Sequence, residues 1–229
     1  AEYSQFPWLR PDQYFKGPYK VYDTLGPGDI EQGALGDCYF LASIAAVAEF
    51  PDRIERLLLT KQVDQNSVYA VALCHDGIWS DVVLDDQVPC QPVSKTPLFN
   101  RSSTKELWVI LLEKAWAKIN GGYQNIAAGL SREALRSLTG ASCKTYFTQQ
   151  DREDIWKKLL LAEEMNFIMT AATDDLDNGS DAYQDKIGIC GSHAYSLLGA
   201  FEVQNIGGQW QRLRNNEKAQ GQVERLVKL

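Results

Sequence analysis

The spacing of hydrophobic side chains changes along the chain, and this change constrains the fold more than any other sequence feature. Between residues 38 and 49, and again between 105 and 119, apolar residues recur every three or four positions, as in helices packed on a core. A further helix is predicted at 151–165, with Asp151 as its N-cap. After it the period shortens, which predicts strands at 166–171, 193–203 and 209–214. We therefore expect an α+β protein.

The change of period also suggests a division of the chain. We place the boundary near residue 131 and expect a helical subdomain at 1–131 and a strand-rich subdomain at 132–229. Inside the first, apolar runs at 68–74 and 78–84 are separated by His75-Asp76-Gly77, which predicts a hairpin. Residues 1–37 show little periodicity and are expected to be irregular.

Composition excludes several functions. The formal net charge is -7, so a nucleic-acid backbone would be repelled. No apolar run reaches the ~20 residues that a membrane-spanning helix needs. The 5 cysteines are scattered and form no CxxC pair, which favours a reducing compartment over a disulfide framework or a zinc site.

The segment QGALGDCYFLA, which begins at Gln32, is the strongest local signal for chemistry. Cys38 is expected in the first turn of a helix, where the helix dipole favours the reactive thiolate. Gly33 and Gly36 allow a tight turn before it, and Asp37 is expected to cap the helix. The amide of Gln32 and the backbone N–H of Cys38 are candidates for an oxyanion hole. The alternative is that Cys38 is an ordinary buried cysteine.

A nucleophilic thiol needs a base, and the chain offers only 2 histidines. His75 is expected at a solvated hairpin tip, whereas His193 begins an apolar strand and is the better candidate. Asn215 ends the next predicted strand, across the Gly207-Gly208 turn, so a hairpin would bring it close to His193 and let it orient the imidazole. Cys, His and Asn in this order and spacing are typical of papain-type enzymes. Taken singly, His193 as a structural histidine and Asn215 as a turn residue remain open.

Six blocks between about residues 19 and 215 resemble the calpain family in the family's own order. They are QGALGDCYFLASIAAVAEFPDRI, WSDVVLDDQVPC, ELWVILLEKAWAKINGGY, LTGA, GICGSHAYSLLGAFEV and RLRN. The first matches the nucleophile segment Q-G-x-L-G-D-C-W-F-L, and the fifth matches the histidine strand G-H-A-Y-[ST]-V.

The resemblance implies a papain-like fold, with the substrate cleft between a helical subdomain and a strand-rich one. It assigns Cys38 as nucleophile, His193 as base, Asn215 as the residue that orients the base, and Gln32 to the oxyanion hole. It also implies a cytoplasmic endopeptidase that makes limited cuts in other proteins as part of a longer multidomain chain. The chemistry needs no cofactor, although calcium activates the family.

The sequence departs from the family pattern at several points. Asn215 is followed by Asn-Glu-Lys and not by Pro-Trp-Gly, whose Trp shields the Asn–His hydrogen bond from water, so a lower rate is expected. The family's acidic, Trp-rich continuation is not seen before residue 229. Asp29 matches one family calcium ligand, but Gln124 stands where the family has Glu, which weakens that site.

Three further interpretations stay open. The acidic run at 173–181 fails the EF-hand spacing and is expected to be a solvated loop at the cleft mouth. A catalytically weak or inactive calpain-like module, serving as a structural part of an assembly, would explain the departures after Asn215. Acyl transfer of the transglutaminase kind is a third possibility, although Asn215 in place of Asp favours hydrolysis.

Overall fold

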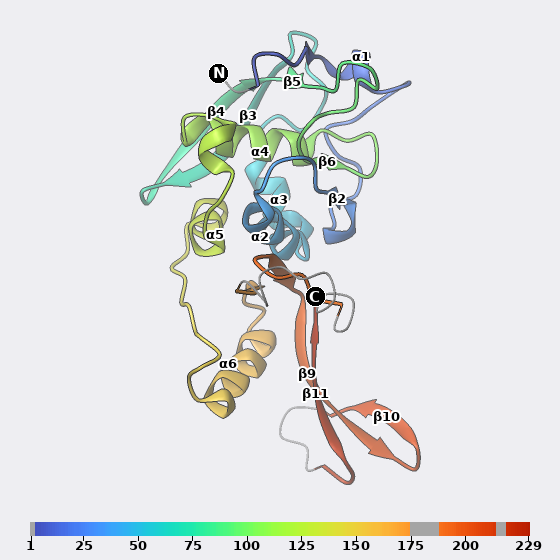
Figure 1. The fold of residues 1–229 in the computed structure, drawn as a ribbon, viewed down its shortest axis with the longest axis vertical. Helices are drawn as coiled ribbons and strands as arrows, with labels where there is room; N and C mark the ends of the chain where they lie inside the picture. Colours follow the sequence, from blue (N-terminus) through green and yellow to red (C-terminus); the bar gives the residue numbers. More distant parts are fainter. Residues whose placement is uncertain (1–2, 175–187, 214–218) are drawn as a thin grey trace.

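The structure, a computed structural model, describes residues 3–174, 188–213 and 219–229. Its elements form two parts that lie one above the other in Figure 1. The upper part contains the elements up to α5 (Ser131–Thr139), and the lower part contains α6 (Arg152–Glu164) and the strands that follow it. A mixed helix and strand architecture is therefore confirmed.

The upper part is built around two helices, α2 (Cys38–Ala48) and α4 (Trp108–Ile119). An antiparallel hairpin of β3 (Val68–His75) and β4 (Ile78–Asp85) packs against α4. The shorter elements are β1 (Trp8–Leu9), α1 (Pro11–Tyr14), η1 (Pro27–Asp29), β2 (Ile30–Glu31), α3 (Pro51–Leu57), β5 (Val88–Pro89), β6 (Arg101–Ser102) and η2 (Tyr123–Ile126). β1 pairs with β5, and β2 pairs with β6.

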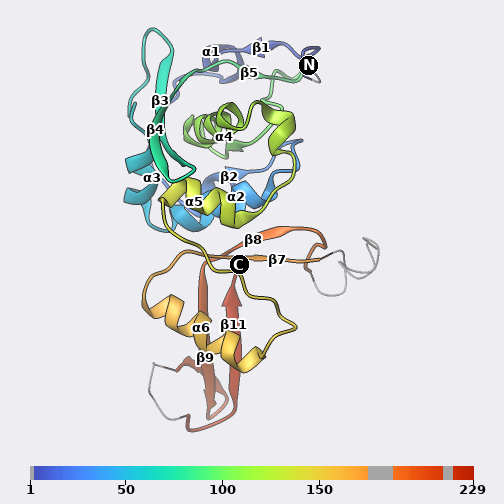
Figure 2. The same ribbon diagram turned by 90° about the vertical axis from the view of Figure 1, so that its left-hand side faces the viewer.

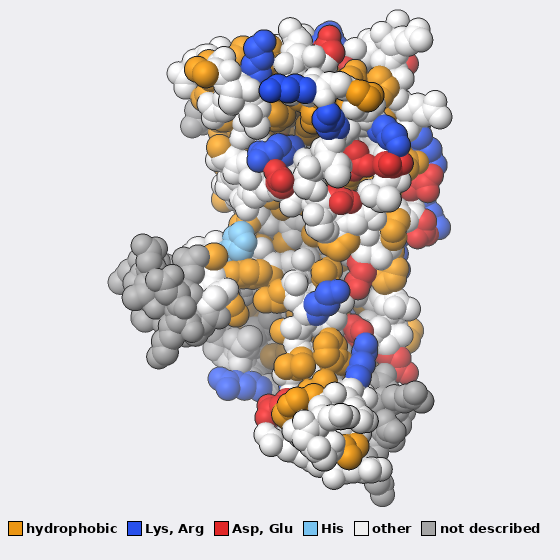
Figure 3. Space-filling model, turned by 90° about the vertical axis from the view of Figure 1, so that its right-hand side faces the viewer, with side chains coloured by type: hydrophobic (Ala, Val, Ile, Leu, Met, Phe, Trp, Pro, Cys, Tyr) orange, Lys and Arg blue, Asp and Glu red, His pale blue; other side chains and the backbone are white. Residues whose placement is uncertain are grey.

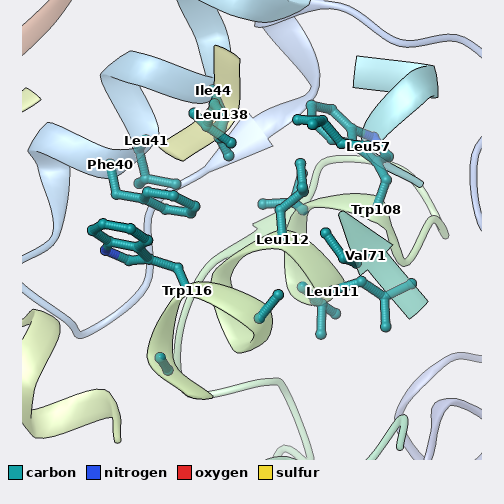
Figure 4. Packing of buried hydrophobic residues seen from close by; sticks show 14 of the residues in the cluster. Phe40, Leu41, Ile44, Leu57, Val71, Trp108, Leu111, Leu112, Trp116 and Leu138 are labelled. Atoms are coloured by element: carbon teal, nitrogen blue, oxygen red, sulfur yellow. The ribbon is translucent and has the colours of Figure 1, made fainter. Parts of the chain in front are cut away.

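The core of this part lies where α2, α4 and β3 meet (Figure 4). Phe40 of α2 stacks on Trp116 of α4 with ring centroids 5.4 Å apart. Ile44, Trp108 and Leu112 are also fully buried in this cluster. Burial of one such side chain contributes about 1.5–3 kcal/mol, so the helix that begins at Cys38 is firmly anchored.

The lower part contains two sheets. β7 (Met169–Ala172) pairs antiparallel with β8 (Ala194–Leu197). β9 (Gly199–Ile206) pairs antiparallel with both β10 (Gln209–Arg212) and β11 (Val223–Lys228). Figure 2 shows β7 and β8 directly below α2, and Ala194 of β8 joins the upper core. The β7–β8 pair thus connects the two parts.

The predicted helix at 38–49 and the hairpin are confirmed, and so is the helix at 151–165. The side chain of Asp151 accepts hydrogen bonds from the N–H groups of Glu153 and Asp154, as expected of an N-cap. The helix predicted from 105 begins at Trp108 instead. The strand predicted at 166–171 is β7, which begins only at Met169.

The single strand predicted at 193–203 is wrong, because the chain leaves one sheet and enters another at Leu198. The N–H of Leu198 donates to the carbonyl of Lys228, at the end of β11, and not to β7. The segment is therefore two strands, β8 and β9, in different sheets. As a result, the hairpin of β9 and β10 does not contain His193.

The division near residue 131 stays a prediction. Helix α5, which begins there, packs on α2 and β3, and its Leu135 and Leu138 belong to the upper core. Among the described residues, no helix has both the length and the apolar character needed to cross a membrane.

Candidate active site

Cys38 is the first residue of α2, and its side chain is half-buried. The carbonyl of Asp37 accepts the N–H groups of Phe40 and Leu41 at 2.8 and 3.2 Å, so the helix begins at once after the turn. The N–H of Cys38 is among the first of α2, which have no partner within the helix. The thiol therefore lies at the positive end of the helix dipole, where an anionic sulfur is favoured.

The turn before Cys38 is held against the segment 97–100. Ala34 N–H donates to the carbonyl of Leu98 at 2.9 Å. A Cβ on Gly33 would lie 2.2 Å from the carbonyl oxygen of Phe99, so only glycine fits this approach. Gln32 is exposed, and its Nε2 donates one hydrogen bond to Leu35 O at 3.1 Å. Among the described residues its second amide hydrogen has no acceptor, so it can donate to an incoming oxygen.

The expectation that Asp37 caps α2 with its side chain is wrong. The residue occupies the N-cap position, but its carboxylate makes no capping bond and is fully buried. It turns inward and accepts a 2.7 Å hydrogen bond from Asn100 Nδ2. Burial raises the pKa of this carboxyl to about 6. Asp37 turns inward because three segments meet behind the turn. The local sequence does not reveal this meeting.

His193 lies immediately before β8 and is half-buried. Its N–H donates to Thr173 Oγ1 at 3.1 Å, and its carbonyl accepts the N–H of Thr173 at 2.9 Å. The imidazole contacts the ring of Tyr195 edge-on, with centroids 4.8 Å apart. Tyr195 Oη in turn accepts the N–H of Cys190 at 2.7 Å, which fixes the loop that leads to His193.

Strand β8 packs on α2, so the strand that follows His193 lies beside the helix that begins at Cys38. Burial is the main cause that raises the pKa of Tyr195, and its hydrogen bond from the N–H of Cys190 partly offsets the effect. In the described part of the chain, the Cys38 thiol and the His193 ring are not hydrogen bonded to each other. Such bonds commonly shorten only when substrate binds.

Asn215 lies outside the described residues, and so does most of the acidic run at 173–181, from Asp175 onward. Their predicted roles stay predictions. His75 is the last residue of β3, at the exposed hairpin tip, 3.6 Å from Asp76, in line with the solvated position expected for it.

The donor set around Asp29 does not fit a strong calcium site. Burial and the charge of Glu106 raise the pKa of Asp29. Glu106, however, already accepts hydrogen bonds from Asp23 N–H and Trp108 Nε1. Gln124 is exposed and neutral. Across residues 3–174, 188–213 and 219–229, no three acidic, His or Cys side chains converge as metal ligands.

Four residues that support the site were missed from the sequence: Asn100, Glu113, Thr173 and Tyr195. Tyr195 could have been predicted from the sequence, since it lies two residues after His193 and strand alternation puts both on one face. Asn100 and Glu113 gave no signal, because their burial depends on segments distant in sequence.

A family model described as "Calpain family cysteine protease" matches residues 1–229. The chain is 33% identical over 209 residues to the calpain-type cysteine protease DEK1 of Arabidopsis thaliana, covering 86% of this chain and 10% of that protein. It is 32% identical over 223 residues to the calpain-1 catalytic subunit of Sus scrofa, covering 95% and 30%. A calpain of Schistosoma mansoni is 35% identical over 219 residues, covering 91% and 28%.

These relatives are much longer than the region they share with this chain, which spans less than a third of each. The family match nevertheless extends over the turn before Cys38, helix α2 and strand β8. The chain belongs to the calpain family of cysteine proteases.

Proposed function

We propose that this chain is the protease core of a calpain-like endopeptidase that makes limited cuts in intracellular proteins. The observation that carries the proposal is the packing of β8, the histidine strand, against α2, the helix that begins at Cys38. Family membership supports the same chemistry. The two subdomains would be arranged as in papain, with the substrate between them. The lengths of the relatives favour a larger multidomain protein.

In this reaction His193 takes the proton of Cys38, and the thiolate attacks the scissile carbonyl. The oxyanion accepts hydrogen bonds from Cys38 N–H and from the free amide hydrogen of Gln32. His193 then protonates the leaving amine, and a water activated by the same imidazole hydrolyses the thioester. Asn215 would hold the imidazole in the tautomer that this cycle needs.

No step requires a metal or an organic cofactor. Calcium would act, if at all, as an activator in the full-length protein. Gln124 stands where the family has Glu, and both carboxylate oxygens of Glu106 already accept hydrogen bonds. These two features support a protease activity that depends little on a calcium ion at Asp29.

The second candidate is a catalytically weak calpain-like module with a structural role. It is favoured by the sequence after Asn215 and by the lack of a hydrogen bond between Cys38 and His193 in the described residues.

The test compares full-length wild-type protein with Cys38→Ser, using an unfolded protein substrate and a thiol-directed inhibitor, with and without calcium. The proposal expects Cys38→Ser to abolish cleavage and inhibitor labelling. Cys143→Ser, which removes another half-buried thiol, is the matched control and should keep both. A wild-type protein that neither cleaves nor labels at Cys38 would establish the structural module instead.

A further inference from the structure

A cluster of three polar side chains lies directly behind the nucleophile turn. Asp37, Asn100 and Glu113 expose 0%, 1% and 1% of their surface. They come from the residue before α2, the segment before β6 and the middle of α4. No Lys or Arg forms an ion pair with either carboxyl among the described residues. Buried carboxyls persist only when other groups satisfy them, so the hydrogen bonds of this cluster need an explanation.

Asn100 connects both ends of the turn. Its Oδ1 accepts the N–H of Gly33 at 2.9 Å, and its Nδ2 donates to Asp37 Oδ2 at 2.7 Å. These two partners also fix which end of the amide is oxygen. The backbone N–H of Asn100 donates to Glu113 Oε1 at 3.4 Å. One residue therefore ties Gly33, Asp37 and helix α4 together.

The carboxyls of Asp37 and Glu113 can hydrogen bond to each other only if one of them carries a proton. Asp37 Oδ1 is buried and finds no donor among the described residues. Asn100 brings the two carboxyls to the same place, since its N–H donates to Glu113 and its Nδ2 donates to Asp37. Burial and the charge of Asp37 raise the pKa of Glu113 well above its usual value. A protonated Glu113 would supply the donor that Asp37 Oδ1 lacks. Tyr39 and Tyr123 also face the pair, and burial raises the pKa of both phenols, so neither adds charge at neutral pH.

We propose that Asn100, Asp37 and Glu113 are positioning residues of the protease reaction. They hold the turn at 32–37 against α4, so that the amide of Gln32 and the N–H of Cys38 point to one oxyanion. This inference rests on the proposed function, because a fixed turn matters for rate only if an oxyanion forms there. Donors that are already oriented lower the barrier without reorganising during the reaction.

The test measures kcat and KM of the full-length protein per active site titrated with an irreversible thiol inhibitor. Titration removes molecules that failed to fold from the comparison. Asn100→Leu should lower kcat at least tenfold and leave KM within about twofold, because transition-state contacts are lost while substrate contacts remain. Asn120→Leu is the matched control: it removes an Asn side-chain hydrogen bond at the other end of α4, to Trp116 O, and should keep the wild-type kcat.

If Asn100→Leu does not fold, variants of Glu113 provide an independent test. Glu113→Gln keeps a neutral donor for Asp37 and should retain most of kcat, whereas Glu113→Leu removes the donor and should not. Equal kcat in Asn100→Leu and Asn120→Leu, or equal loss in Glu113→Gln and Glu113→Leu, would overturn the positioning role. Either result leaves the proposed function intact while wild type cleaves and Cys38→Ser does not. An inactive wild type overturns both.

Discussion

The loop around His193 is held by hydrogen bonds from several neighbouring residues. Ser192, the residue before it, has a φ of 47°, so the loop turns sharply into β8. Thr173 bonds the backbone of His193 on both sides, and its Oγ1 also donates to Cys190 O at 2.7 Å. Tyr195 closes the loop from the other side. The backbone on both sides of the His193 imidazole is thus held by its own loop.

This arrangement predicts the effect of Tyr195→Phe. The substitution keeps the ring that contacts His193 but removes the oxygen that accepts Cys190 N–H. We expect kcat to fall about fivefold with KM unchanged, the equivalent of the ~1 kcal/mol that one hydrogen bond contributes. The measurement is steady-state cleavage, together with the pH dependence of Cys38 alkylation, which reports the thiolate.

Tyr146→Phe is the matched control, because it removes the hydroxyl of an exposed tyrosine that contacts Lys158 and lies outside the site. It should behave as wild type. If both variants show the same kcat and the same alkylation profile, Tyr195 does not position the histidine.

The sequence predicts the candidate catalytic residues better than it predicts the contacts around them. Cys38 and His193 follow from the helix start, from the scarcity of histidine and from the family motifs. The orientation of Asp37 does not follow, since a residue before a helix usually caps it. Its inward turn requires Asn100, which is 63 positions away in sequence.

For some helices and strands, the hydrophobic periodicity of the sequence is enough to predict the structure. The predicted hairpin of β3 and β4 turns at Asp76-Gly77, with His75 paired to Ile78, and both turn residues have positive φ. Helix α2 ends at Ala48, and Pro51 occupies the first position of α3. Proline suits that position because its missing N–H has no partner there. The break at Leu198 gives little local signal, because β8 and β9 together form one apolar run.

The nucleophile turn gives a prediction at the scale of the element. Gly33→Ala would place a methyl group against the backbone of Phe99, which cannot move without shifting β6. We expect kcat/KM to fall at least tenfold, since a displacement of about 1 Å can lower a rate about 100-fold. Cleavage per titrated active site is the measurement.

Gly28→Ala is the control for this substitution, because a Cβ there meets no atom within 4 Å. It should leave kcat/KM unchanged. An active Gly33→Ala protein would mean that the turn is not rigid and that the donors of the oxyanion hole do not depend on its contact with Phe99.

The whole molecule has an uneven distribution of buried surface. The large cluster spans Val21 to Leu138, and among the described residues of the second part it gains the buried Ala194 and the partly buried Ile168. The second cluster has just three buried residues among those described, Trp156, Leu197 and Ala200. Every residue of β10 and β11 is exposed. Figure 3 shows hydrophobic side chains on the surface of this lower part, with more charged side chains of both signs on the upper part.

This distribution predicts that the 229-residue chain opens in two stages. Segments with few buried apolar contacts open at lower free energy than the core. We expect the amides of β9, β10 and β11 to exchange at least tenfold faster than those of α2 and α4 in native-state hydrogen exchange, a difference of about 1.4 kcal/mol in opening free energy. The β7–β8 pair should fall between them, because it packs on α2 but shares Leu197 with the smaller cluster.

The order of exchange bears directly on the site. Cys38 and the turn belong to the part with the large core, whereas His193 lies immediately before β8, the strand that joins the two parts. Local opening of the lower sheet would therefore move His193 more than Cys38. If substrate binds across both parts, as proposed, exchange should slow more in β8 than in α4. Equal protection of α4, β8 and β9 would contradict this, since it would show that the chain opens as one cooperative unit despite its unequal cores.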